Sequence, residues 1–155
     1  MIGYATQMGI PRAQPILLVE DTPEDAEATL RAFERAGLGN RIYHCEDGDD
    51  ALDFLHHEGI YQDESTAPRP GMILLDLNMP GTDGREVLEE IKADEALKKI
   101  PVIVLTTSSD ERDIESCYLS GANSYIQKPV DMPGFVQAVQ RLVDYWYQIV
   151  LFPRV

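Results

Sequence analysis

Basic residues are scarce in this sequence of 155 residues. Lysine and arginine together number 13 against 27 aspartates and glutamates, so the formal net charge at pH 7 is −14. A surface this negative repels the phosphates of nucleic acids and of anionic membranes. We therefore expect this chain to bind neither, and no basic run or zinc-finger spacing in it argues otherwise.

Long apolar runs and cysteines are also lacking. No stretch of 18 apolar residues could span a bilayer, and the start, MIGYATQMGIPRAQ, lacks the continuous apolar segment of a signal peptide. We expect a cytoplasmic protein without membrane contact. The two cysteines, Cys45 and Cys117, stand far apart and in no metal-binding spacing, so we expect both to be buried thiols.

The sequence does contain a regular alternation of short apolar runs and helical patterns. Apolar strands of this kind favour a parallel sheet covered on both faces, and right-handed crossovers then give a doubly wound α/β domain. A polar, proline-containing segment at 59–71 predicts a long surface loop. The expected strands are 16–20, 42–45, 72–76, 101–106 and 123–127, and the expected helices are 23–38, 49–58, 85–92, 110–119 and one from 132 onward.

Polar side chains stand where four of these strands end. In open α/β sheets, ligands bind beyond the carboxyl ends of the strands, near the point where the strand order reverses. Residues at those ends therefore meet at one edge of the sheet and form a candidate site. They are Glu20 and Asp21 after the first strand, Asp76 at the end of the third, Thr106 at the end of the fourth and Lys128 after the fifth.

Each of these residues, taken alone, also has a structural explanation. Thr22 suits a helix N-cap with a proline behind it, although capping leaves the two acids before it unexplained. Asp76 could open a turn. Lys128 could be a surface charge and Thr106 an ordinary strand residue. Their joint occurrence at one sheet edge favours a site.

The chemistry that suits this set is phosphoryl transfer. Crowded carboxylates repel one another unless a cation neutralises them, and Mg²⁺ prefers oxygen ligands. A metal and a lysine also stabilise the charge of a transferring phosphoryl group, and a carboxylate can act as its nucleophile. We predict Asp76 as the nucleophile. Lys128 would pair with the phosphoryl oxygens, and the Thr106 hydroxyl would hydrogen-bond one of them.

Four motifs together resemble the receiver family of two-component response regulators over residues 15–141: LLVEDTPED, LLDLNMPGTDG, PVIVLTTS and GANSYIQKP. The resemblance implies a flavodoxin-like sheet with strand order 2-1-3-4-5 and helices on both faces. It also implies Asp76 as phosphoacceptor of a histidine kinase. Asp21, Asp76 and the backbone carbonyl of Asn78 would bind Mg²⁺, and Glu20 would act on the metal through a water.

The same resemblance implies two further features. Tyr125 would be an aromatic switch that turns inward when Thr106 moves toward the phosphate, and the Lys128–Pro129 bond would be cis, which is uncommon for X–Pro bonds. Glu20 stands where the family more often has aspartate, so the metal affinity and the dephosphorylation rate stay open.

The expected domains are a flexible segment at 1–14, a receiver domain at 15–143 and an aromatic extension of the last helix at 144–155. With no effector domain expected, output would go through protein contacts, and the only reactions catalysed would be the protein's own phosphorylation and dephosphorylation. The proline-containing loop, the segment DLNMPGTDGREVLEEIK and the aromatic tail resemble the small response regulators of bacterial and cyanobacterial phytochromes. This implies a red-light-sensing histidine kinase as donor.

The last helix carries two apolar stripes, and only one is needed to cover the sheet. The tail YWYQIVLFP is also too apolar to be left in water. We therefore predict a homodimer through this helix and tail. A tail folded back on its own domain stays open as the alternative. The stripes are Phe135, Val139, Leu142 and Trp146, and Val136, Val143, Tyr147 and Val150.

Three other interpretations fit this sequence less well. A phosphohydrolase of the haloacid dehalogenase type needs an acid two residues after the nucleophile, where this chain has Asn78. A flavodoxin-like FMN carrier needs a phosphate loop after the first strand, where EDTPED would repel phosphate. A docking receiver that is never phosphorylated does not need so complete a site. We expect no metal site from the histidines, with His44 on a strand and His56 and His57 on a solvated helix face.

Overall fold

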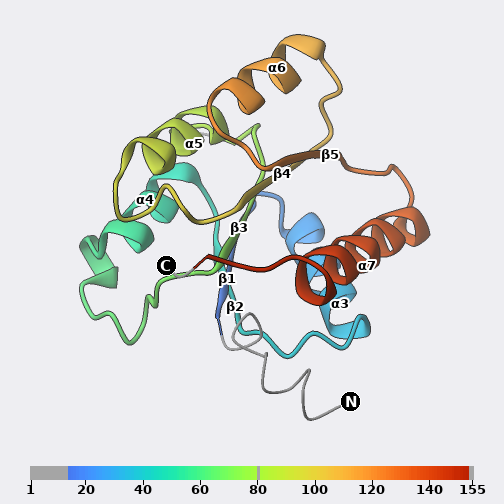
Figure 1. The fold of residues 1–155 in the computed structure, drawn as a ribbon, viewed down its shortest axis with the longest axis horizontal. Helices are drawn as coiled ribbons and strands as arrows, with labels where there is room; N and C mark the ends of the chain where they lie inside the picture. Colours follow the sequence, from blue (N-terminus) through green and yellow to red (C-terminus); the bar gives the residue numbers. More distant parts are fainter. Residues whose placement is uncertain (1–13, 80, 154–155) are drawn as a thin grey trace.

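The computed structural model describes residues 14–79 and 81–153. Its five strands form one parallel sheet in the order β2-β1-β3-β4-β5 (Figure 1). The chain adds β2 on one side of β1 and β3 on the other, so the strand order reverses beside β1. The doubly wound α/β fold and its strand order are thus confirmed. The strands are β1 (Ile16–Val19), β2 (Ile42–Cys45), β3 (Met72–Leu75), β4 (Val102–Thr106) and β5 (Ser124–Gln127).

Helices cover both faces of the sheet, which explains why β1 and β3 are apolar at every position. Side chains alternate between the two faces of a strand. In β1, Leu17 and Val19 face one hydrophobic cluster, and Ile16 and Leu18 face the other. The first cluster lies under α4 (Gly48–His56), α5 (Gly84–Ala93) and α6 (Glu111–Leu119). The second lies under α3 (Pro23–Arg35) and α7 (Met132–Gln148) (Figure 1).

Aspartates begin four of the five α-helices in the part of the chain that the structure describes. The side chains of Asp47, Asp83, Asp110 and Asp131 each accept a hydrogen bond from a backbone N–H in the first turn of the helix that follows. Helix α3 differs from these four. Thr22 occupies the predicted N-cap position of α3, with a proline behind it, but within the described residues its side chain makes no capping hydrogen bond.

The loop at 59–71 is anchored at several points. It contains a short 3-10 helix, η1 (Gly59–Tyr61), and the Tyr61 hydroxyl donates to Asp50 Oδ1 at 2.8 Å. His57 ends α4 in a left-handed conformation with φ of 57°, and its Nε2 lies 2.8 Å from the carbonyl oxygen of Ala67. His56 is partly buried, with one ring nitrogen 3.8 Å from a carboxylate oxygen of Glu90. The prediction of one solvated histidine face was wrong, because α5 and the loop cover it.

The C-terminal tail folds back on its own domain (Figure 1). The ring of Phe152 stacks on Tyr147 and meets Trp146 edge-on, with centroids 5.2 and 5.8 Å apart. The Tyr147 hydroxyl lies 3.8 Å from Met72 Sδ in β3, and Val143 is buried. The expectation that the second stripe has no use inside the molecule was therefore wrong. Residues of both stripes pack against the same hydrophobic cluster under α7 and are at least partly buried there.

Cys45 and Cys117 are buried free thiols, as predicted. Of the predicted flexible segment 1–14, all but Gln14 lies outside the described residues. Among the helices that are described, none is both long and apolar enough to cross a membrane.

Candidate functional site

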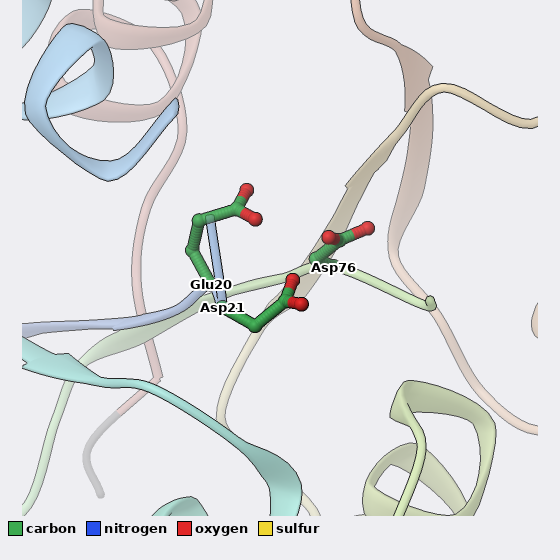
Figure 2. Close-up of side chains that lie close together, drawn as sticks. All are labelled: Glu20, Asp21 and Asp76. Carbon is green, nitrogen blue, oxygen red and sulfur yellow. The ribbon is translucent and has the colours of Figure 1, made fainter. Parts of the chain in front are cut away.

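Three carboxylates meet at the carboxyl ends of β1 and β3. Glu20, Asp21 and Asp76 each offer an oxygen, and these oxygens lie within 4.8 Å of one another (Figure 2). Glu20 and Asp76 are buried, and Asp21 is half-buried. The structure thus brings together all three acids that were predicted from the strand ends.

The register of the sheet accounts for this meeting. Val19 pairs with Leu75 at the end of the β1–β3 ladder. The ladder continues for one more step, since the Asp76 N–H donates to the Val19 carbonyl at 3.0 Å. The next residues along both strands therefore emerge side by side at the point where the strand order reverses.

Lys128 reaches this cluster from the end of β5. Its own N–H donates to the carbonyl of Thr106 at 2.7 Å, which extends the β4–β5 ladder past its last pair. Its Nζ lies 2.5 Å from Glu20 Oε1 and 3.8 Å from Asp76 Oδ2. A third carboxylate, Asp25 in the first turn of α3, accepts from the same Nζ at 2.9 Å.

Asp25 was missed by the sequence analysis. Its position in the first turn of a helix had a complete explanation in the favourable placement of acids at helix N-termini. Its position could have indicated this role, because Asp25 follows the acid pair Glu20 and Asp21 by only four residues and lies in the first turn of the helix that leaves the site.

Negative charge exceeds positive charge at this cluster. Burial raises the pKa of Glu20 to about 7; the hydrogen bond from Lys128 opposes this shift, and the charge of Asp76 adds to it. Burial alone would lower the pKa of Lys128, but hydrogen bonds to Glu20 and Asp25 outweigh it, so this pKa is raised. One ammonium thus faces several carboxylates. A divalent cation with a preference for oxygen ligands fits this donor set.

The other predicted site residues lie on neighbouring elements: Thr106 ends β4, Asn78 follows β3, and Tyr125 lies in β5. Thr106 is fully buried at the end of β4, and its Oγ1 is 3.4 Å from the N–H of Ser108. The Asn78 N–H lies 3.4 Å from Asp76 Oδ1, on the loop that follows β3. The Tyr125 ring packs against the core, and its hydroxyl donates to the Ser108 carbonyl at 3.0 Å.

The Lys128–Pro129 bond corrects an expectation. It is not cis, and the structure has no cis bond among the peptides it describes. The prediction of a cis bond was wrong. Trans is the favoured isomer for X–Pro by roughly 0.5–1 kcal/mol.

A charged network ties down the loop that follows Thr106. The Ser108 hydroxyl donates to Asp113 Oδ2 at 2.7 Å, and Arg85 of α5 donates to Asp113 Oδ1 at 2.7 Å. The Ser108 hydrogen bond, and after it the Arg85 pair, lower the pKa of Asp113. This network links α5, α6 and the loop beside the site, and sequence patterns alone did not indicate it.

Comparisons with known proteins agree with this geometry. A family model described as the response regulator receiver domain matches residues 16–140. The probable methanogenesis regulatory protein FilR2 of Methanothrix harundinacea is 44% identical over 132 residues, which cover 84% of this chain and 82% of that protein. Response regulator Rcp1 of Synechocystis is 39% identical over 138 residues, which cover 89% of this chain and 92% of Rcp1.

Solved structures give the same likeness. The Mn²⁺-bound form of Rcp1 matches with a TM-score of 0.85 at 38% identity, over 91% of this chain and 99% of the other. The phosphorylated cyanobacterial phytochrome response regulator RcpA matches with a TM-score of 0.85 at 39% identity, over 92% and 99% of the two chains. These relatives do not support the hydrolase and FMN-carrier alternatives.

Proposed function

Because this chain belongs to the family of response regulator receiver domains, we propose that it accepts a phosphoryl group on Asp76 from a histidine kinase, with Mg²⁺ bound beside it. The observation that carries the proposal is the meeting of Glu20, Asp21 and Asp76 with the Lys128 ammonium at the switch point of the sheet. The protein would be a signalling protein of the cytoplasm that transfers phosphate to no other substrate.

Each residue of the site has a defined task in this reaction. The ionised Asp76 carboxylate attacks phosphorus, so an O–P bond forms while the N–P bond of the phosphohistidine breaks and its electron pair stays on the imidazole. Lys128 and the Thr106 hydroxyl approach the phosphoryl oxygens as negative charge develops there.

The metal ligands proposed are the carboxylates of Asp21 and Asp76 and the backbone carbonyl of Asn78, with Glu20 acting through a water. A bound Mg²⁺ would offset the repulsion between these acids and the incoming phosphoryl group. Rcp1 supports this proposal, since its structure has been solved in a Mn²⁺-bound form. As the family resemblance implies, the Tyr125 side chain would turn inward when Thr106 moves toward a phosphoryl group on Asp76.

The test is incubation with acetyl phosphate and Mg²⁺, followed by intact mass measurement. We expect the addition of one labile phosphoryl group, which Asp76→Asn abolishes. Asp63→Asn, which removes a surface carboxylate from the loop before β3, serves as the matched control and should leave the addition intact. An unmodified wild-type protein, or an unchanged yield in Asp76→Asn, would contradict the proposal.

A phytochrome kinase is the donor that we propose. RcpA, named as a cyanobacterial phytochrome response regulator, supports this at 39% identity over nearly the whole of both chains. FilR2 carries a different role at 44% identity, so the donor must be compared directly. Transfer from a red-light-sensing kinase should exceed transfer from an unrelated histidine kinase by at least about tenfold, a difference of roughly 1.4 kcal/mol in the barrier. Equal rates would exclude this pairing.

We also propose a homodimer through α7 and the tail. Although the tail folds back, Tyr145, Ile149 and Leu151 remain exposed at the end of α7 and beyond it. Exposed apolar side chains clustered on one segment are typical of an interface. In light scattering, Ile149→Glu with Leu151→Glu should halve the mass, whereas Ile60→Glu, at an exposed position on η1, should not. A monomeric wild-type protein would refute the dimer.

A further inference from the structure

Three carboxylates compete for the one ammonium of Lys128. Nζ lies 2.5 Å from Glu20 Oε1 and 2.9 Å from Asp25 Oδ2, both within hydrogen-bond distance. Asp76 Oδ2 is 3.8 Å away, beyond that distance. In this state, therefore, the lysine is held by its two neighbours on the β1–α3 side of the site and makes no hydrogen bond to the proposed phosphoacceptor, with which it forms only a longer ion pair.

The two carboxylates that hold the lysine differ in exposure. The Glu20 side chain is 3% exposed and that of Asp25 is 41% exposed. Asp25 also lines a surface hollow of about 290 Å³ together with Lys128, Thr107 and Pro129. Water can therefore solvate Asp25 when the lysine leaves it, whereas Glu20 would stay buried with only the Thr22 N–H, 3.3 Å from its Oε2, as a partner. Asp25 is thus the contact that costs least to break.

We propose that Asp25 is a positioning residue that restrains Lys128 on the α3 side of the site and thereby slows phosphoryl transfer onto Asp76. This inference rests on the proposed function, since it assigns a role within the same reaction. An interaction made before the reaction and lost as the transition state forms raises the barrier. The Lys128–Asp25 bond has this property, because Nζ must turn toward the phosphoryl group beside Asp76.

Glu20 keeps Lys128 within the site when the Lys128–Asp25 bond breaks. It keeps its bond to the ammonium at the floor of the site, so the loss of Asp25 does not release Lys128 into solvent. Partly exposed ion pairs contribute at most about 1 kcal/mol, which corresponds to a rate factor of about two to five. Loss of the Asp25 carboxylate is therefore expected to accelerate phosphorylation of Asp76 moderately.

The test compares Asp25→Asn with wild type at subsaturating acetyl phosphate and saturating Mg²⁺. We expect phosphorylation of Asp76 to become about two- to fivefold faster, and Asp25→Ala to behave alike. Loss of the phosphoryl group after the donor is removed should keep its wild-type rate, because Lys128 has by then left Asp25. Glu24→Gln removes a neighbouring acid from the first turn of α3 and should change neither rate.

A double-mutant cycle tests whether the effect passes through the lysine. In the Lys128→Gln background, followed over longer incubation, Asp25→Asn should no longer accelerate phosphorylation. Persistence of the acceleration there would overturn the proposal. So would a rate at or below wild type in both Asp25 variants when thermal unfolding shows that they are folded.

These experiments distinguish an error in the proposed function from an error in the role inferred for Asp25. If wild-type Asp76 takes up no phosphoryl group, the proposed function itself is wrong. If wild type is phosphorylated and the Asp25 variants match it, the restraint alone is refuted.

Discussion

The Lys128 ammonium lies 2.5 Å from the carboxylate of Glu20, although 108 residues separate the two in the sequence. Both side chains are almost fully buried. The pair joins the ends of β1 and β5, which are not neighbours in the sheet. It therefore stabilises the floor of the site as well as serving its chemistry.

Loss of Lys128 should destabilise the fold. Breaking a buried ion pair leaves one charge without compensation, so Lys128→Met should lower the free energy of unfolding by about 3–5 kcal/mol. Adding Glu20→Gln should restore part of it. Urea unfolding in EDTA measures both changes without a metal. Lys98→Met, which breaks the exposed pair with Glu95, is the control and should cost under about 1 kcal/mol. Equal stabilities for Lys128→Met and wild type would refute this role.

Mg²⁺ should stabilise the protein against heat. A ligand that binds only the folded state adds RT ln(1 + [L]/Kd), about 2.7 kcal/mol at one hundred times the Kd. Asp21→Asn removes one carboxylate of the cluster without touching Lys128, so most of this stabilisation should disappear. Calorimetric scans with Mg²⁺ and with EDTA measure the difference. A midpoint insensitive to Mg²⁺ in wild type would argue against a metal site.

Gly84 should tolerate no side chain. A Cβ at this position would overlap the backbone carbonyl oxygen of Asp76 and approach Leu77 Cα within 2.7 Å, so the backbone that carries Asp76 must shift. Gly84→Ala should cost about 1–3 kcal/mol of stability and slow phosphorylation. Gly39→Ala is the matched control, since a Cβ there meets no atom within 4 Å among the described residues. Unfolding curves and phosphorylation rates test both variants, and a fully active Gly84→Ala protein would contradict the close packing.

Asp113 should contribute stability that depends on pH. Its folded pKa is depressed below the ordinary value of 3.8 by Ser108 and then Arg85, so its contribution is present above pH 3.8 and lost as the pH falls through the lower folded value. Because the pair lies near the surface, Asp113→Asn should cost only about 0.5–1 kcal/mol at pH 7. Urea unfolding of both proteins should show this gap narrowing toward pH 3. Glu111→Gln, in the first turn of the same helix, is the control, and a gap that widens in acid would refute the assignment.

The motifs of the strand ends predicted much of the site. Glu20, Asp21, Asp76 and Lys128 come together as expected, because parallel strands bring their carboxyl ends to one edge of the sheet. Asp25 was not predicted, since acids in a first helical turn are common and the bond to Lys128 depends on how α3 leaves the sheet.

The structure differs from the predictions based on local sequence patterns in three places. The covered face of His56 and His57 and the folded-back tail depend on neighbours that are distant in sequence. The trans Lys128–Pro129 bond is instead the isomer that X–Pro bonds ordinarily favour. The two stripes of α7 are visible in the sequence, but their partners Met72 and Phe152 are not.

The sequence by itself determined the alternation of strands and helices, the parallel α/β fold that this alternation favours and the acids and lysine at the sheet edge. These depend on periodicity and on residue types along the chain. The tertiary structure alone decided which carboxylates share the lysine, how exposed each of them is and where the apolar tail packs. The reason is that short distances and burial arise only when segments far apart in the chain are brought into contact.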